Sequence, residues 1–203
     1  KTTLMRLLCG LLTPASGTIE VFGEAYPRGI DAVKPRLGYV SQRFSLYGDL
    51  TVRENLDFFA DLHGVRGAEA RRRKAELLEF TRLAPFGDRL ADRLSGGMKQ
   101  KLSLICTLIH EPDLLLLDEP TTGVDPITRR DFWSILSTLI GQGLTIVMST
   151  PYLDEAERCS RVALVDGGEV LAEGDPHDLR RGSDQQVLEI VCSRVREAAH
   201  ALG

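Results

Sequence analysis

The sequence predicts an α/β fold built around a sheet of parallel strands. Strands and helices alternate along the chain, which is the order expected of a parallel sheet with crossover helices. Two predicted strands, 113–118 and 144–148, are almost wholly apolar, as strands covered on both faces of a sheet are. The helical stretch that follows the strand at 36–42 indicates an inserted helical subdomain, which we place at about residues 43–110.

The first predicted elements are a helix and two strands. Leucines at helical spacing predict a helix over 1–12, which Thr13 and Pro14 end. A short strand is expected over 17–23, and another over 36–42. Because the helical period is present from the first residue, we expect further structure to precede Lys1 in the full-length protein.

Capping signals mark the helices that follow. Thr51 with Glu54 three residues later forms a capping-box pattern at the start of a helix that ends near Gly64. Ser95 precedes a strongly periodic helix, and Asp125 followed by proline starts the next one.

The last predicted elements are short. A helix over 153–159 follows the strand at 144–148, and a hairpin comes next, with its turn at Asp166–Gly167. Beyond residue 182 the pattern changes, with a strand expected over 185–193 and a helix over 194–202.

The charge balance does not favour a polyanionic partner. The chain has 203 residues, 43% of them apolar, with 25 Lys and Arg against 29 Asp and Glu, a net charge of −4. We therefore expect no nucleic acid partner. The basic run at 71–74 lies inside a predicted helix over 67–83, and we interpret it as a solvated helix face rather than a phosphate-binding patch.

Cysteines and apolar runs indicate a reducing, aqueous compartment. The four cysteines are far apart and have no neighbouring histidine at metal-ligand spacing, which argues against a zinc site and a disulfide framework. The apolar runs are far shorter than the ~20 residues that a membrane-spanning helix needs. Any membrane association must therefore go through a partner.

Three short motifs carry the predicted chemistry. Lys1, Thr2 and Thr3 lie at a predicted helix N-terminus, where in G-x-x-x-x-G-K-[ST] loops the lysine reaches the β and γ phosphates and the hydroxyl binds Mg²⁺. Asp118 and Glu119 end an apolar strand, where charge is costly without a counter-ion. Asp118 suits a water-bridged Mg²⁺ ligand, and Glu119 suits a base that polarises water.

The third motif is Ser95-Gly96-Gly97, whose hydroxyl and exposed N–H groups can form an anion cradle. Each motif has a structural alternative. The lysine motif could be a chance start inside a solvated helix end, the carboxylates could cap a sheet edge, and the glycines could form an ordinary capped loop. The spacing of 23 residues between Ser95 and Asp118 favours the functional interpretation.

Together these motifs resemble the nucleotide-binding domain of an ABC ATPase. KTT looks like the tail of the Walker A loop, Gln42 like the Q-loop, LSGGMKQK like the signature, LLLLDEP like Walker B and TTGVD like the D-loop. The five motifs occur in the family's order over about residues 1–180. The resemblance implies a P-loop NTPase (RecA-like) core with an ABC-type helical subdomain.

The resemblance also implies roles for these residues. Glu119 would be the general base and Gln42 would sense the metal and the γ-phosphate. Metal ligation would fall to Thr2, Gln42 and Asp118. Residues implied to bind ATP, on this or the opposite domain, are Lys1, Thr2, Thr3, Ser95, Gly96, Gly97, Asp118 and Asp125.

A narrower resemblance points to exporters. Met98 in the signature and the phrase TVRENLDFFADLHGV look like the export branch whose permeases are of the ABC-2 type. STPYLDEAERC and LIHEPDLLLLDEPTTGVDP look closest to the first ATPase domain of bacterial putative multidrug exporters that carry two such domains in one polypeptide.

Two departures from the family pattern matter. The glycine half of the phosphate loop, the first strands and the aromatic that stacks on adenine are not in this sequence, so we do not expect this stretch alone to bind ATP. Pro151 stands where the family places a switch histidine that contacts the γ-phosphate, and proline has no N–H and no titratable group. No obvious substitute exists among His63, His110, His177 and His200.

We therefore expect an ABC ATPase domain over 1–181 and the start of a C-terminal extension or linker over 182–203. With ATP and Mg²⁺, it would dimerise with a second nucleotide-binding domain, in a homodimer or a tandem chain, and drive export through an ABC-2 type permease. It would lie in the cytoplasm at the inner face of the membrane, with its own site slowed by Pro151. The alternatives are a non-hydrolysing ATP-binding regulatory module and a soluble ABC ATPase acting on the ribosome or nucleic acid.

Overall fold

A computed structural model describes residues 1–42 and 45–181 of the chain. They fall into two compact units, the first running from Lys1 to Pro151 and the second starting at Tyr152. The strand expected over 185–193 and the helix expected over 194–202 lie outside the described residues. The domain boundary that we place at residue 181 stays a prediction.

The first unit is built on a three-stranded parallel sheet in the order β3-β4-β5. The strands are β3 (Leu37–Val40), β4 (Leu114–Asp118) and β5 (Thr145–Ser149). Leu115, Leu116 and Leu117 in the central strand β4 have no exposed surface, as expected for a strand covered on both faces. The α/β prediction with a parallel sheet is therefore confirmed.

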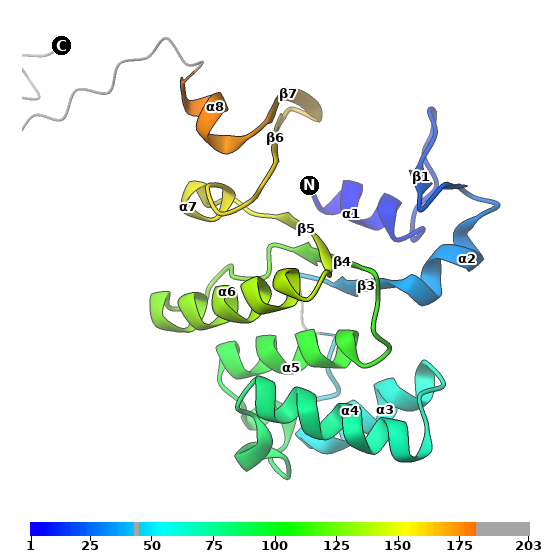
Figure 1. The fold of residues 1–203 in the computed structure, drawn as a ribbon, viewed down its shortest axis with the longest axis vertical. Coiled ribbons are helices and arrows are strands. Elements are labelled where there is room, and N and C mark those ends of the chain that lie inside the picture. The colour runs from blue at the N-terminus through cyan, green and yellow to red at the C-terminus, as the bar shows by residue number, and fades with distance from the viewer. Residues whose placement is uncertain (43–44, 182–203) are drawn as a thin grey trace, which may run out of the picture. The chain divides into compact units, whose positions relative to one another are not determined.

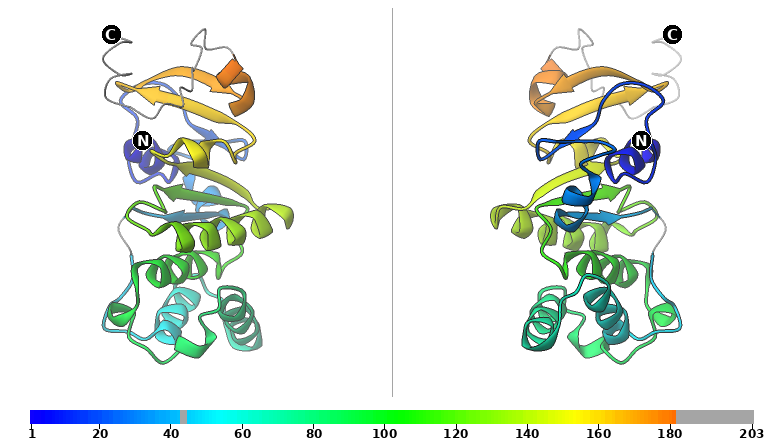
Figure 2. Two further views of the ribbon diagram at one scale, coloured as in Figure 1. Left: turned by 90° about the vertical axis from the view of Figure 1, so that its left-hand side faces the viewer. Right: turned by 90° about the vertical axis from the view of Figure 1, so that its right-hand side faces the viewer.

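Helices cover both faces of this sheet (Figure 1). Helix α1 (Thr2–Leu8) packs on one face, where Met5 and Cys9 form a buried cluster with Leu116. Helices α5 (Gly96–Leu108) and α6 (Pro126–Gly141) lie on the opposite side of the sheet, as the side views in Figure 2 also show. The sheet that carries the strand ends therefore lies between α1 on one face and α5 and α6 on the other.

The helical part of the first unit lies beyond α5. It contains α3 (Val52–Leu62), α4 (Gly67–Phe80) and the short 3₁₀ turns η2 (Ala84–Phe86) and η3 (Ala91–Arg93). These helices pack around Leu56 and Leu83, which meet Leu102 and Ile105 of α5 in one buried cluster. This part lies within the range 43–110 that the sequence predicts for a helical subdomain.

The predicted helix caps are all present. Thr51 and Glu54 form a reciprocal capping box, with Thr51 N–H donating to Glu54 Oε2 at 2.8 Å and Glu54 N–H donating to Thr51 Oγ1 at 3.2 Å. Ser95 Oγ accepts from the backbone of Met98 at the start of α5, and Asp125 caps α6. These three local predictions are confirmed.

The strand expected over 17–23 is shorter than the sequence indicates. It reduces to β1 (Glu20–Val21), which pairs antiparallel with β2 (Glu24–Ala25). The next two residues, Phe22 and Gly23, have positive φ angles of 55° and 79°, so the chain turns there instead of extending. Helix α2 (Ile30–Val33) and the 3₁₀ turn η1 (Lys34–Arg36) then lead into β3.

The second unit contains the predicted hairpin and two short helices. Helix α7 (Leu153–Ala156) is shorter than the expected 153–159, and β6 (Val162–Asp166) pairs with β7 (Glu169–Gly174) before α8 (Pro176–Arg181). The turn residues are Gly167 and Gly168, not Asp166 and Gly167. Both glycines have positive φ, as both central residues of a type I′ hairpin turn do.

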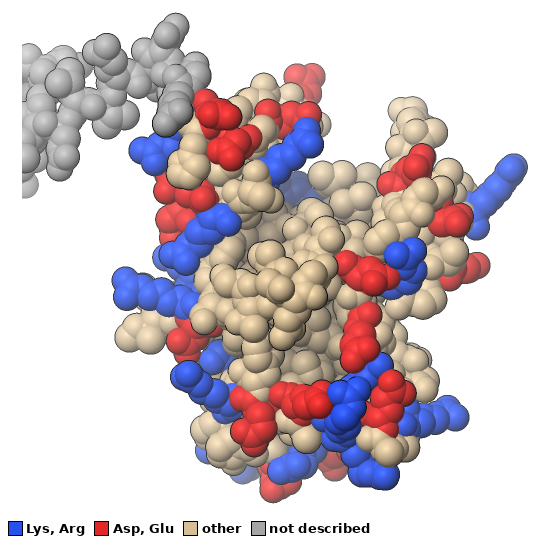
Figure 3. Space-filling view, viewed as in Figure 1, with Lys and Arg blue, Asp and Glu red and all other residues tan. Residues whose placement is uncertain are grey.

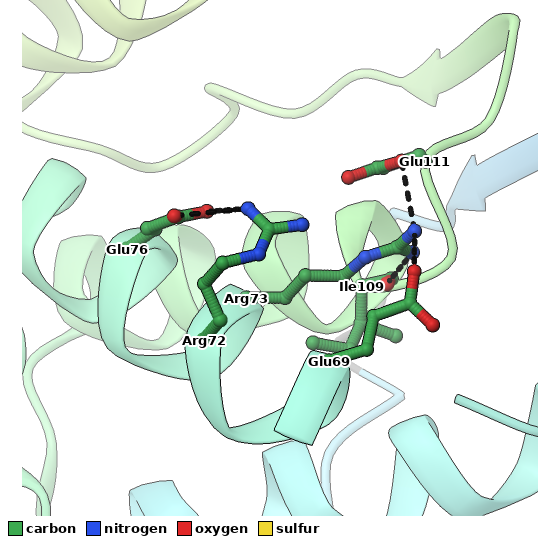
Figure 4. A network of polar contacts seen from close by, with 6 residues as sticks. All are labelled: Glu69, Arg72, Arg73, Glu76, Ile109 and Glu111. Atoms are coloured by element: carbon green, nitrogen blue, oxygen red, sulfur yellow. Dashed lines mark hydrogen bonds and ion pairs between the residues drawn. The ribbon is translucent and has the colours of Figure 1, made fainter. Parts of the chain in front are cut away.

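The basic run at 71–74 is only partly the solvated helix face that the sequence predicts: Arg71 and Arg72 are exposed, whereas the side chains of Arg73 and Lys74 are 13% and 24% exposed. On α4, Arg72 pairs with Glu76, and Lys74 pairs with Asp57 of α3. Arg73 bonds both Glu69 and Glu111, so blue and red side chains alternate over this surface (Figure 3; close-up in Figure 4). In the described ranges, no helix is both long and apolar enough to cross a membrane.

Candidate functional site

Strands β4 and β5 end side by side because they are parallel and paired in register. Asp118, the last residue of β4, lies opposite Ser149, the last residue of β5. Asp118 has no exposed surface, so its carboxylate needs polar partners. Ser149 Oγ donates to Asp118 Oδ1 at 2.7 Å, and the hydroxyl of Tyr39 lies 3.5 Å from Oδ2. Burial and the nearby Asp118 raise the pKa of Tyr39, which therefore stays a neutral donor.

Glu119 follows in an unusual backbone conformation. Its φ is 49°, in the left-handed region, which costs a residue other than glycine roughly 1–3 kcal/mol. The Glu119 N–H is held by Ser149, whose Oγ lies 3.0 Å and whose carbonyl oxygen lies 3.1 Å from the nitrogen. Residues 118 and 119 are thus both tied to one side chain of the neighbouring strand.

Two donors hold the Glu119 side chain. Gln42 Nε2, from the segment after β3, donates to Glu119 Oε2 at 3.2 Å. Thr122 Oγ1 donates to the same oxygen at 3.3 Å. The Gln42 motif and the Asp118-Glu119 motif, which are far apart in sequence, therefore meet at one edge of the sheet.

Lys1 lies at the same edge. It precedes the first turn of α1, and its Nζ donates to the carbonyl oxygen of Thr150 at 2.9 Å. Thr150 directly follows Ser149, so the lysine, the amide and the two carboxylates gather at the carboxyl ends of the three strands. Thr2 starts α1 and is half-buried, whereas Thr3 is exposed.

The glycines of the predicted signature form a second group with Asp125. Ser95 Oγ caps α5 at 3.3 Å from the Met98 nitrogen, and Gly97 packs so close to Thr128 that an added Cβ would collide with it. Thr128 is itself held by Asp125, because its Oγ1 donates to Asp125 Oδ2 at 2.6 Å. These bonds lower the pKa of Asp125. The starts of α5 and α6 are therefore packed together.

Pro151 is the last residue of the first unit and is exposed. The two described histidines of this unit lie elsewhere: His63 and His110 stack with 3.9 Å between ring centroids, and His110 Nε2 lies 3.3 Å from the carbonyl oxygen of Leu37, at the start of β3. Burial and then His63 lower the pKa of His110 to about 4. This pair therefore lies at the other end of the strand from Gln42.

A broad hollow of about 560 Å³ lies away from the carboxylate edge. It is lined by residues of α4 and by those around the ends of α5 and α6, among them Phe80, Leu108 and Leu139. It shares no residue with the group around Glu119 and gives no support to a nucleotide site.

The description of the family model that matches residues 1–122 is "ABC transporter". The chain belongs to the ABC transporter family. The resemblance inferred from the five motifs is confirmed, and with it the P-loop NTPase fold class. In this ABC domain, Gln42, Asp118 and Glu119 lie at the carboxyl edge of the parallel sheet.

Relatives of this ABC domain are named as ATP-binding proteins of transport or export systems. The probable multidrug ABC transporter ATP-binding protein YbhF of Escherichia coli (strain K12) is 54% identical over 179 residues, covering 88% of this chain and 31% of that protein. The Nod factor export ATP-binding protein I of Cupriavidus metallidurans is 43% identical over 180 residues, covering 88% of this chain and 59% of that protein. The chain thus spans about a third to three fifths of these relatives.

A solved ATP-binding subunit of an ABC transporter has the same fold. Its TM-score to this chain is 0.78 at 32% sequence identity, and the match covers 89% of this chain and 76% of that one. The α/β class predicted from the sequence is therefore shared with a known ABC ATP-binding subunit.

Ser149 and Thr122 were not among the site residues predicted from the sequence. Ser149 becomes a candidate only once the register of β4 against β5 is known, because that register places it opposite Asp118. Thr122 is close to Glu119 in sequence, and the turn that joins them places its hydroxyl against the carboxylate.

Proposed function

We propose that this chain binds and hydrolyses ATP and drives export of a substrate through a membrane permease. The family membership and the names of the relatives support the proposal. The observation that carries it is the gathering of a lysine, an amide and two carboxylates at one edge of a parallel sheet, where α/β folds bind ligands. These residues are Lys1, Gln42, Asp118 and Glu119.

The residues suit the steps of phosphate transfer to water. Lys1 Nζ would leave the Thr150 carbonyl and bind the β and γ phosphates of ATP. Glu119 Oε2 is held by Gln42 and Thr122, which leaves Oε1 to accept a hydrogen bond from the attacking water. The carboxylate orients this water and receives its proton.

The oxygen chemistry at this edge fits Mg²⁺. Thr2 offers a hydroxyl, Gln42 an amide oxygen and Asp118 a carboxylate whose oxygens each keep a second lone pair. Within residues 1–42 and 45–181, no group of three or more His, Cys, Asp or Glu could hold a metal ion. When bound, Mg²⁺ neutralises phosphate charge during the transfer.

Pro151 leads us to propose a slow site. The family's histidine would supply a donor to the developing phosphate charge, and the loss of one such donor costs roughly 10²- to 10³-fold in rate. Proline has no side-chain donor, and in the first unit the described histidines lie at the other end of the sheet. Ser95 and Gly97 would still complete the ATP site of a partner domain.

The partners are a second nucleotide-binding domain, from another copy or the same polypeptide, and an ABC-2 type permease. ATP would close the two domains on each other, with Asp125 near the seam, and the segment after Gln42 would pass the movement to the permease. Through the permease the protein would lie at the cytoplasmic face of the membrane. The resemblance to the first domain of a two-domain exporter belongs to the same proposal.

A non-hydrolysing ATP-binding module is the second candidate, because Pro151 removes a catalytic group. It differs from the first candidate in one measurable respect. In the hydrolysing domain Glu119 is needed for turnover, whereas in the regulatory module its carboxylate has no catalytic task.

The test uses the full-length protein with its permease and the Glu119→Gln variant. We expect the variant to retain bound ATP after gel filtration and to lose the slow phase of single-turnover hydrolysis, while Lys1→Ala loses the bound ATP. Hydrolysis of wild-type rate and amplitude in Glu119→Gln would exclude the hydrolytic role. Absence of ATP binding by the wild-type protein would exclude both candidates.

A further inference from the structure

Ser149 connects the two carboxylates of the candidate site. We propose that Ser149 is a positioning residue for Asp118 and Glu119, and that Thr122 completes its hold on Glu119. The inference rests on the proposed function, and it assigns to two hydroxyls the task of fixing the general base where position 151 is proline.

The first support is that the Ser149 hydroxyl both donates and accepts a hydrogen bond at this site. Ser149 Oγ has a single proton, which it donates to Asp118 Oδ1 at 2.7 Å. A lone pair on the same oxygen then accepts the N–H of Glu119 at 3.0 Å. The orientation of the buried aspartate and the backbone of the glutamate are therefore set together by one side chain.

Burial strengthens this link. Ser149 is 7% exposed and Asp118 is fully buried, so water has little access to replace either bond. Hydrogen bonds to an ionised group are stronger than bonds between neutral groups. If residue 149 had no hydroxyl, the buried Oδ1 of Asp118 would lose its hydrogen-bond donor.

The backbone of Glu119 gives the second support. A φ of 49° is unfavourable for glutamate and persists only when surrounding bonds fix it. Ser149 supplies two acceptors for this N–H, the hydroxyl and the carbonyl oxygen. Without the hydroxyl only the carbonyl remains, and the peptide can relax, which moves the carboxylate that must face the water.

Thr122 acts on the other end of Glu119. Its hydroxyl and Gln42 Nε2 both donate to Oε2, at 3.3 and 3.2 Å, so the rotation of the carboxylate is restricted. Pro151 has no side-chain donor, so Gln42 and Thr122 hold the side chain of Glu119 in its place. Misplacement of a reacting group by about 1 Å can cost about 10²-fold in rate.

The test compares Ser149→Ala and Ser149→Thr in the full-length protein under single-turnover and steady-state conditions. The hydrolysis phase that Glu119→Gln removes reports this site. We expect Ser149→Ala to slow that phase by about 10-fold to 10²-fold with little change in the KM for ATP. Ser149→Thr should recover most of the rate because it restores the hydroxyl.

Thr122→Val and Thr122→Ser form an independent pair on the exposed side of the site. Thr122→Val keeps the shape and loses the donor, so we expect a smaller loss of rate, and Thr122→Ser should recover it. Thr145→Val, at the exposed start of β5, is the matched control and should hydrolyse ATP as the wild type does. Bound ATP per chain corrects each rate for the folded fraction.

The outcomes separate the two levels of the proposal. If the wild type hydrolyses ATP and Ser149→Ala does so at the same corrected rate, the positioning role is wrong and the proposed function stands. If the wild type binds no ATP or shows no hydrolysis phase that depends on Glu119, the proposed function itself fails.

Discussion

Gly97 lies closer to a neighbouring side chain than Gly96 does. A Cβ added at Gly97 would collide with Thr128, which cannot turn away freely because Asp125 holds its hydroxyl. A Cβ added at Gly96 would meet no atom within 4 Å.

We therefore expect Gly97→Ala to destabilise the protein by about 1–3 kcal/mol through overpacking, and Gly96→Ala to change stability little. The measurement is the urea midpoint of unfolding of each variant beside the wild type. Equal midpoints for the two variants would contradict the close packing of α5 on α6.

At the residue scale, the sequence predicted the residues that bear charge and missed those that orient them. An apolar run ending in two carboxylates is a local pattern, so Asp118 and Glu119 could be found directly. Ser149 could not, because its partner lies 31 residues away and is chosen by strand register. Thr122 was passed over because a hydroxyl near a turn is common.

Arg73 fixes helix α4 to the segment that leads into β4. Its side chain is 13% exposed, and its guanidinium donates to the carbonyl oxygen of Ile109 at 2.9 Å and to the carboxylates of Glu69 and Glu111 at 2.7 and 2.9 Å (Figure 4). We expect Arg73→Ala to lower the free energy of unfolding by about 1.5–3 kcal/mol, the range for hydrogen bonds to charged groups.

The matched control is Arg72→Ala, one residue earlier on the same helix. Arg72 pairs with the exposed Glu76 of its own helix, so its loss should have a smaller effect. Both variants are compared by chemical unfolding. A larger loss for Arg72→Ala than for Arg73→Ala would contradict the role of Arg73 between the two elements.

The stacked histidines between α3 and the end of α5 predict a pH dependence. Burial and His63 lower the pKa of His110 to about 4, with Arg73 acting in the same direction and the bond to the Leu37 carbonyl opposing it. At pH values between the ordinary histidine pKa of 6.5 and the lowered pKa of about 4, the unfolded chain binds a proton that the folded chain does not. The stability contribution is therefore complete above pH 6.5 and is lost as the pH falls toward 4.

Comparison with His110→Gln tests this expectation, because the glutamine amide reaches about as far as Nε2 and keeps an N–H donor for the Leu37 carbonyl. Unfolding midpoints at about pH 7.5 and about pH 5 should differ more for the wild type than for the variant. An identical pH slope in both proteins would show that His110 does not carry the effect.

At the element scale, local signals were sufficient wherever they were strong. The caps at Thr51, Ser95 and Asp125 set helix starts that the structure reproduces. The strand expected over 17–23 was too long because the positive φ angles of Phe22 and Gly23 turn the chain, and alternating apolar residues did not reveal that turn.

At the scale of the whole molecule, the proposed function gives this chain a part in two composite ATP sites. The carboxylate edge around Glu119 would act on ATP bound by this domain, whereas the starts of α5 and α6 would act on ATP bound by a partner. The five motifs predicted this division through family order. Their spatial separation into two groups follows from the fold, since three motifs gather at the carboxyl edge of the sheet and two lie around the starts of α5 and α6.

Pro151 distinguishes the two proposed composite sites, because it replaces the switch histidine in this domain's own site and leaves the signature residues unchanged. We propose that ATP is hydrolysed slowly at the site that contains Glu119. The signature residues Ser95 and Gly97 would complete the ATP site of the partner domain, so the two composite sites would hydrolyse ATP at unequal rates. A histidine at position 151 should restore a donor to the slow site, provided that Glu119 remains to receive the proton.

The most direct measurement is the ATPase rate of the full-length protein as Pro151→His, as Glu119→Gln and as both together. We predict that Pro151→His raises the rate, by up to about 10²-fold at this site, and that the added Glu119→Gln change removes the gain. No rise with Pro151→His, together with no effect of Glu119→Gln alone, would contradict the account.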